Sequence, residues 1–262
     1  MGLTIIETLR AAGCVFAEEE AELLGAAAGS AEELAAMVAR RAAGEPLEHV
    51  VGWAEFCGLR MAVGEGVFVP RRRTEFLVRE AAELARPGAV VLDLCCGVGA
   101  VGAAVAAEQG FGVELHAADI DPVALGYARR NVAPAGGTVW EGDLYEALPA
   151  ALRGRVDVLV ANAPYVPTDA IGLLPPEARD HEPRTALDGG PDGLSVQRRV
   201  AEAAPAWLAP GGHLLIETSA RQAPHTASAL TAAGLAVRAV TSEDLHATVV
   251  IGTREAAGVA AG

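Results

Sequence analysis

The chain has 262 residues, of which 52% are hydrophobic and 21% are charged, so its composition is that of a folded globular protein and not of a disordered one. This length allows one large domain, or one ordinary domain plus a small one. The formal net charge of −14 argues against a large nucleic-acid-binding surface, because neutralising phosphates requires clustered Lys and Arg.

The sequence has no unbroken apolar stretch of the length that a membrane span requires, and its first residues, MGLTIIETLR, lack the apolar run of a secretory signal peptide. The four cysteines have neither CxxC nor zinc-ligand spacing, and the six histidines show no metal-binding pattern. We therefore expect a cytoplasmic protein with reduced cysteines, no metal site and no membrane contact. A monomer is the favoured oligomeric state.

The first part of the chain is expected to form short helices. Thr4 with Glu7, and Ser30 with Glu33, have the spacing of a capping box, which marks a helix N-terminus. The second of these opens an amphipathic run that continues to Arg41. We expect a helical N-terminal domain over residues 1–48.

Glycines at 52, 58, 64 and 66 divide the next stretch into short apolar runs, which predicts a β-hairpin over residues 50–69. We expect residues 49–75 to link the helical domain to a larger domain over residues 76–262.

Strands and helices alternate after residue 88. Strands are expected over residues 89–94, 113–118, 156–161, 213–217, 235–240 and 247–252, with one more before Glu141, and helices over residues 100–109 and 122–132. Apolar strands separated by helices predict a mostly parallel sheet covered on both faces, so the expected fold class is α/β, Rossmann-like, with seven strands. The last two strands are too close for a crossover helix and are expected to form an antiparallel pair at the end of the sheet.

A cofactor site is expected at the carboxyl ends of the strands. The first strand runs into the glycine loop, residues 93–99 (Asp-Leu-Cys-Cys-Gly-Val-Gly), where glycines let backbone amides and a helix N-terminus approach an anionic group. The second strand ends in Asp119, whose carboxylate can accept both hydroxyls of a ribose. These features fit any adenosine-type cofactor.

A nicotinamide cofactor is one alternative, because residues 97–102 match the GxGxxG fingerprint and Asp119 lies 22 residues after Gly97. Two features argue against it. Asp93 precedes the first glycine and would face a pyrophosphate badly, although it can hold the cationic amine of a methionine. The strand over residues 156–161 also ends in a polar motif that nicotinamide chemistry does not require.

That motif, Asn162-Ala163-Pro164-Tyr165, resembles the [N/D/S]-P-P-[Y/F/W] motif of amino- and amide-methyltransferases. An amide nitrogen is a poor nucleophile, and the Asn162 side-chain oxygen and the Ala163 carbonyl can hold its two hydrogens and align its lone pair with a methyl donor. Tyr165 can pack on the planar acceptor and face the developing cationic charge. By itself the motif is equally compatible with an ordinary strand-to-loop turn. Its position after the cofactor residues favours the functional interpretation.

Three segments carry a closer resemblance. Residues 40–49 (RRAAGEPLEH), residues 68–75 (FVPRRRTE) and residues 181–187 (HEPRTAL) are similar to the RR..GEP..H, IPRPDTE and EP..AL segments of the protein-(glutamine-N5) methyltransferase family of the HemK/PrmC type. The resemblance covers nearly the whole chain. The sequence departs from the family pattern at Arg72 and Arg73, which replace Pro and Asp, at Ala163, which replaces Pro, and at Cys95, which stands at the first glycine of the loop.

The resemblance implies a class I S-adenosylmethionine-dependent methyltransferase, with S-adenosylhomocysteine as product. The family methylates the glutamine of a Gly-Gly-Gln motif in peptide-chain release factors, and its helical N-terminal domain helps to dock this partner. The departures favour a paralogous branch.

The residues carried over from the family fall into three groups. The catalytic residues are Asn162, Ala163, Pro164 and Tyr165; the cofactor-binding residues are Asp93, Cys95, Gly97, Gly99, Asp119, Ile120, Asp143, Leu144 and Asn162; the substrate-binding residues are Arg71, Glu75, Tyr165, Glu182 and Pro183. The arginines at 71–73 are equally compatible with a solvated cluster. Glu217, which closes an apolar strand, is a candidate buried partner for a loop amide.

Other acceptors remain open. The same motif supports methylation of an exocyclic amine on DNA or RNA, which the acidity of the chain and the lack of an evident target-recognition domain disfavour. An N-methyltransferase acting on a small molecule or peptide, and a binding protein without turnover, are further alternatives. Asn162 and Tyr165 argue against the last of these.

Overall fold

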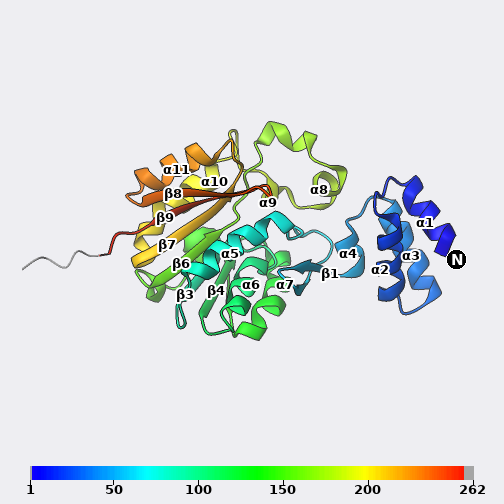
Figure 1. The fold of residues 1–262 in the computed structure, drawn as a ribbon, viewed down its shortest axis with the longest axis horizontal. Helices are drawn as coiled ribbons and strands as arrows, with labels where there is room; N and C mark the ends of the chain where they lie inside the picture. Colours follow the sequence, from blue (N-terminus) through cyan, green and yellow to red (C-terminus); the bar gives the residue numbers. More distant parts are fainter. Residues whose placement is uncertain (1, 257–262) are drawn as a thin grey trace, which may run out of the picture.

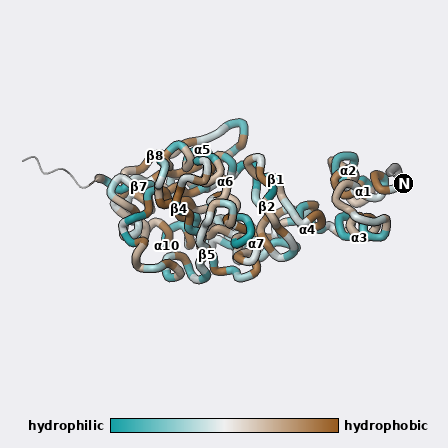
Figure 2. The backbone as a smooth tube through the Cα atoms, turned by 90° about the horizontal axis from the view of Figure 1, so that it is seen from below, coloured by the Kyte–Doolittle hydropathy of each residue, from teal (hydrophilic) through white to brown (hydrophobic). Residues whose placement is uncertain are grey.

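The computed structural model describes residues 2–256. Figure 1 shows three N-terminal helices beside a larger α/β body, with a short helix and a hairpin between them, and Figure 2 shows the same separation after a quarter turn. These helices are α1 (Gly2–Ala11), α2 (Ala17–Ala27) and α3 (Ala31–Ala42). They bury a small apolar core of their own that includes Leu9, Leu24 and Met37.

The two predicted capping boxes have different outcomes. Ser30 is the N-cap of α3, and its hydroxyl accepts a hydrogen bond from the Glu33 amide at 3.1 Å, so this prediction is confirmed. The prediction for Thr4 is wrong, because α1 already begins at Gly2. An N-cap needs non-helical backbone, whereas the Thr4 carbonyl lies within the helix and accepts a bond from the Thr8 hydroxyl at 2.8 Å.

Helix α4 (Leu47–Val51) leads into the predicted hairpin of β1 (Trp53–Phe56) and β2 (Leu59–Ala62). Its two turn residues, Cys57 and Gly58, have φ of 50° and 71°, as a two-residue turn that follows the twist of the strands requires. Since α4 spans residue 48, it crosses the boundary that we propose between the helical domain and the linker.

The sheet has seven strands in the order β5-β4-β3-β6-β7-β9-β8. Its strands are β3 (Val90–Leu94), β4 (Glu114–Asp119), β5 (Thr138–Glu141), β6 (Val156–Ala161), β7 (Leu208–Thr218), β8 (Ala236–Ser242) and β9 (Ala247–Thr253). The first five pair in parallel, and β9 is antiparallel to both β7 and β8. The predicted fold class and the predicted antiparallel pair are therefore confirmed.

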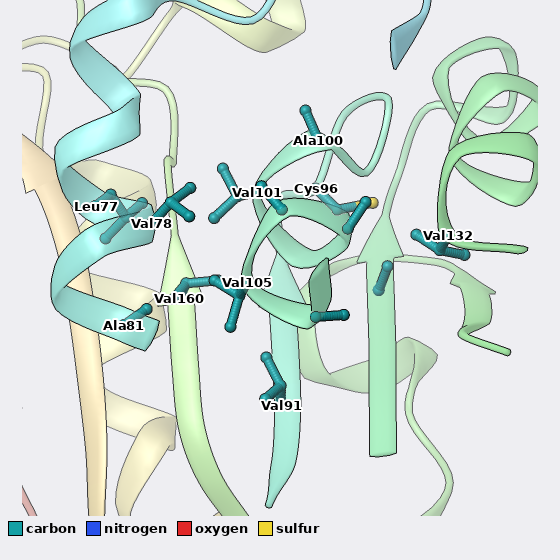
Figure 3. Packing of buried hydrophobic residues seen from close by; sticks show 14 of the residues in the cluster. Leu77, Val78, Ala81, Val91, Cys96, Ala100, Val101, Val105, Val132 and Val160 are labelled. Atoms are coloured by element: carbon teal, nitrogen blue, oxygen red, sulfur yellow. The ribbon is translucent and has the colours of Figure 1, made fainter. Parts of the chain in front are cut away.

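Two helical layers cover this sheet. On one face lie α5 (Glu75–Leu84), α6 (Ala100–Glu108) and α7 (Pro122–Val132), and on the other lie α10 (Ser195–Ala203) and α11 (Ala223–Ala232). Neighbouring residues of β3 point to opposite layers, since Val91 packs in the first and Leu92 in the second. Figure 3 shows Val105 of α6 beside Val160 of β6 in the first layer. Both faces are buried, which explains the continuous apolar runs in the sequence.

The carboxyl ends of β3, β4, β6 and β7 lie at one edge of the sheet, where ligands of open α/β folds bind. A cover segment, residues 168–187, lies over this edge and contains η5 (Thr168–Leu173), α8 (Pro176–His181) and α9 (Arg184–Leu187). The cover segment also reaches the N-terminal helices, because Glu177 of α8 pairs with Arg41 of α3 at 2.8 Å. Among residues 2–256, no helix is long and apolar enough to cross a membrane.

Candidate active site

A cleft of about 960 Å³ opens at the carboxyl ends of the strands, and it gathers most of the residues that the sequence singled out. Those that line it are Arg71, Asp93, Cys95, Gly97, Asp119, Ile120, Asp143, Leu144, Asn162, Ala163, Pro164, Tyr165, Glu182 and Pro183. Two predicted residues are not among the lining residues. Gly99 is the N-cap of α6, where a Cβ would lie 3.3 Å from the Ala128 Cα of α7. Glu75 begins α5 and faces Arg79 at 3.9 Å.

Asp93 lines the cleft near the end of β3 and is almost fully buried, with 1% of its surface exposed. Its Oδ2 accepts a hydrogen bond from the Gly102 amide of α6 at 2.8 Å. Burial raises the pKa of this carboxyl to about 7, and the charge of Asp119 acts in the same direction. A cation held here would favour the ionised form, so the site suits the ammonium group of a methionine.

Asp119 ends the neighbouring strand and fixes the glycine loop. Its carboxylate accepts hydrogen bonds from the Gly97 amide at 2.7 Å and from the Asp121 amide at 2.9 Å. Burial raises the pKa of Asp119, and these two backbone bonds oppose the rise. Each carboxylate oxygen can accept a second bond, which leaves capacity for ribose hydroxyls.

The next residues along this wall are mixed in character. Ile120 is 58% exposed although it is large and apolar, and it faces the cleft. Asp143, in the loop after β5, pairs with Arg199 of α10 at 2.8 Å. An apolar side chain between carboxylates is the pattern expected for an adenosine, whose base is apolar on its faces while its ribose carries hydroxyls. The residues present therefore fit S-adenosylmethionine.

Cys95 has a φ of 58°, in the left-handed region that a residue with a Cβ adopts at a cost of about 1–2 kcal/mol. Burial raises the pKa of its thiol, so the sulfur stays protonated and is no nucleophile. We expect Cys95→Gly to increase the free energy of unfolding by up to about 1 kcal/mol, because relief of strain exceeds the entropy that glycine adds to the unfolded chain. Urea denaturation measures this change.

Cys95→Ala is the matched control, since it removes the sulfur and keeps the Cβ. It should give no gain in stability. If the alanine variant were stabilised as much as the glycine variant, the sulfur and not the backbone would be the source of the strain.

The loop at residues 162–165 leaves the end of β6, and a second loop holds it in place. Val166 donates its amide to the Leu187 carbonyl at 3.0 Å, and the Gly189 amide donates back to the Val166 carbonyl at 2.9 Å. A Cβ on Gly189 would lie 2.6 Å from the Pro164 carbonyl oxygen, and one on Gly193 would lie 2.3 Å from that of Tyr165. The glycine-rich loop at 189–193 therefore packs directly on the motif.

Sequence reasoning missed this second loop, together with Gln222, whose Nε2 donates to the Tyr165 carbonyl at 2.9 Å. The run Gly-Gly-Pro-Asp-Gly at 189–193 is the signal that could have found it, because such a density of glycine marks close approach of two backbones. Nothing in the type of residue at 222 points to the site.

Tyr165 lies near two charged side chains, Arg73 and Glu217, that are not among the site residues implied by the family resemblance. The Arg73 guanidinium lies over its ring, 5.9 Å from the centroid. Burial and the nearby Glu217 carboxylate raise the pKa of the Tyr165 hydroxyl, so the phenol is neutral. Arg73 also faces Glu217, with its Nε 3.4 Å from Oε1.

Glu182 links the cover segment to the chain between hairpin and sheet. Its Oε1 accepts from the Val69 amide at 3.1 Å and from the Arg71 guanidinium at 2.6 Å. Among the described residues, Oε2 is buried and has no hydrogen-bond partner. Burial raises the pKa of Glu182 and Arg71 opposes the rise. In this geometry Arg71 and Glu182 hold the wall of the cleft together.

The order of the sheet, the acids at the ends of β3 and β4, the glycine loop between them and the Asn162 motif at the end of β6 define a class I S-adenosylmethionine-dependent methyltransferase. Residues 64–172 match the family model of the methyltransferase small domain. A crystal structure of a methyltransferase from Pyrococcus furiosus superposes with a TM-score of 0.57 at 18% identity, covering 76% of this chain and 90% of that chain.

Curated relatives give the particular family. The release factor glutamine methyltransferase of Geobacter sulfurreducens is 44% identical over 73% of this chain and 68% of its own length. That of Mycolicibacterium smegmatis is 39% identical over 86% and 85%, and that of Bradyrhizobium diazoefficiens is 35% identical over 92% and 89%. The chain belongs to the release factor glutamine methyltransferase family, as the sequence resemblance implied.

Proposed function

We propose that this enzyme transfers a methyl group to the side-chain amide nitrogen of the glutamine in the Gly-Gly-Gln motif of a peptide-chain release factor. The observation that carries the proposal is the position of Asn162, which lines the same cleft as Asp93 and Asp119. The names of the curated relatives, which specify a release factor and a glutamine, support the acceptor.

The proposed role of Asn162 is to orient the acceptor amide. S-adenosylmethionine, when bound, supplies an electrophilic methyl group on a sulfonium. The Asn162 side-chain oxygen and the Ala163 carbonyl hold the two hydrogens of the acceptor amide, so its lone pair points along the line of transfer. No strong base is required, because the nitrogen proton becomes acidic as the nitrogen gains positive charge.

The cleft also has apolar lining residues that suit a peptide acceptor. Phe56 of the hairpin, Phe68 and Pro70 line the cleft, together with Leu174 and Pro175 of the cover segment. Apolar side chains of this kind would exclude water from the reacting amide. Tyr165, whose neutral ring faces the cleft, packs on the planar amide group.

The test is transfer of labelled methyl from S-adenosylmethionine to a purified release factor, beside a factor whose motif glutamine is replaced. Label on the unaltered factor alone supports the proposal. No label, with S-adenosylhomocysteine binding shown by calorimetry, would reject the release factor as acceptor and favour a paralogous enzyme with another acceptor. The proposal also includes a monomeric enzyme in the cytoplasm with no direct contact to nucleic acid.

A further inference from the structure

The side chain of Gln222 bridges the two loops that meet beside the acceptor site. Gln222 directly precedes α11 and is 6% exposed. Its Nε2 donates to the Tyr165 carbonyl at 2.9 Å and to the Asp192 carbonyl at 3.2 Å. The first carbonyl belongs to the loop at residues 162–165, and the second belongs to the glycine-rich loop at 189–193. One side-chain amide therefore holds both loops.

The orientation of the Gln222 amide follows from the chemistry of its partners. The two groups that face Nε2 are backbone carbonyls, which can only accept a hydrogen bond, so the NH2 end must point toward them. At the other end, Oε1 accepts from the Ser219 hydroxyl at 2.6 Å. The Ser219 oxygen accepts in turn from the Gln222 backbone amide at 3.2 Å. The reverse orientation would place an oxygen against two carbonyl oxygens, so the side chain has one stable orientation.

Gln222 and Ser219 are attached to the packed body of the domain. Ser219 directly follows β7, which is the neighbour of β6 in the sheet. Helix α11 is joined to α10 by the Thr226 hydroxyl, which donates to Gln197 Oε1 at 2.7 Å. Because these elements are packed on the sheet, the bridge ties the two loops to a fixed frame.

The effect of Gln222 on the reactants must be indirect, because Gln222 is not among the residues that line the cleft, whereas Tyr165 is. A shift of about 1 Å at a reacting group can lower a rate by about 10²-fold, so a bond that fixes the Tyr165 backbone bears on the rate. We propose that Gln222, oriented by Ser219, is a positioning residue that holds Tyr165 and the loop at residues 162–165 in place against the acceptor. The importance of this position for methyl transfer rests on the proposed function.

Gln222→Met tests this role, because methionine has a similar volume and no donor. We expect kcat to fall by about 10- to 100-fold, while the affinity for S-adenosylhomocysteine stays within about threefold of the wild type. Thr226→Val is the matched control, since it removes another buried hydrogen bond of α11. Among the described residues, the Thr226 side chain bonds neither loop, so kcat of this control should stay within about threefold of the wild type.

Urea denaturation shows how far each of the two variants is destabilised. Equal losses of kcat in Gln222→Met and Thr226→Val would overturn the proposal, because reduced stability would then explain the loss. An unchanged kcat in Gln222→Met would overturn it as well. If the methionine variant fails to fold, Gln222→Glu takes its place, since an ionised carboxylate keeps the acceptor for Ser219 and loses both donors.

Amide hydrogen exchange gives an answer that does not depend on the acceptor. The Val166 amide donates to the Leu187 carbonyl and the Gly189 amide donates to the Val166 carbonyl, so both amides report whether the loops open. We expect both to exchange about tenfold faster in Gln222→Met, the effect of losing roughly one hydrogen bond, and to keep the wild-type rate in Thr226→Val. Unchanged exchange in the methionine variant would reject the positioning role even if the release factor is methylated. Faster exchange confined to that variant would support it even if another molecule is the acceptor.

Discussion

Asn162→Ala is expected to lower methyl transfer to the release factor by about 10²–10³-fold, the loss typical of removing one preorganised hydrogen-bonding group from an active site. The alanine methyl cannot hold the hydrogen of the acceptor amide, and the Ala163 carbonyl alone does not align the lone pair. The measurement is single-turnover transfer of labelled methyl at saturating cofactor, which reports the chemical step without product release.

Cofactor binding is the control for this variant. Asp93, Asp119 and Ile120 also line the cleft and are unchanged in this variant, so the affinity for S-adenosylhomocysteine should fall by less than about tenfold, the loss of roughly one neutral hydrogen bond. An Asn162→Ala enzyme that keeps transfer within a few-fold of the wild type would contradict the assignment of Asn162 as the acceptor-holding residue.

The parts of the fold that the sequence predicts are those that a local pattern determines. Buried parallel strands leave continuous apolar runs, and β3 and β6 were therefore expected within a residue of their observed bounds. Once these strands are parallel, their carboxyl ends must share one edge. Asp119 and Asn162, 43 positions apart (162 − 119) in the sequence, could thus be expected in one cleft.

The contacts that the sequence does not predict join backbone atoms or distant side chains. Gln222 holds the Tyr165 carbonyl, and such a bond requires no particular residue type at position 165. Arg73 and Glu217 are 144 positions apart and meet only because η1 (Arg72–Thr74) lies against the end of β7. Glu75 is the substrate-binding residue that the family resemblance implies but that does not line the cleft; its carboxylate lies 3.9 Å from Arg79, so its role in substrate binding stays a prediction.

Gly193 is the unpredicted residue with the largest expected effect. Its φ is 76°, and a Cβ there would lie 2.3 Å from the Tyr165 carbonyl oxygen and 2.5 Å from Gln222 Nε2. Gly193→Ala must therefore separate the bond that fixes Tyr165. We expect it to lower the free energy of unfolding by about 2–4 kcal/mol, from left-handed strain plus overpacking, and to lower methyl transfer by about 10²-fold. Urea denaturation and the single-turnover assay measure the two effects.

Gly154→Ala is the control that separates left-handed backbone strain from overpacking. Gly154 has a similar φ of 71°, yet a Cβ there would meet nothing within 4 Å, and it precedes β6 at the end of the strand opposite the cleft. Gly154→Ala should therefore cost only the backbone strain of about 1–2 kcal/mol and leave methyl transfer unchanged. Equal losses of activity in the two variants would mean that reduced stability, and not displacement of Tyr165, limits the enzyme. A loss confined to Gly193→Ala would show that the second loop sets the geometry of the acceptor site.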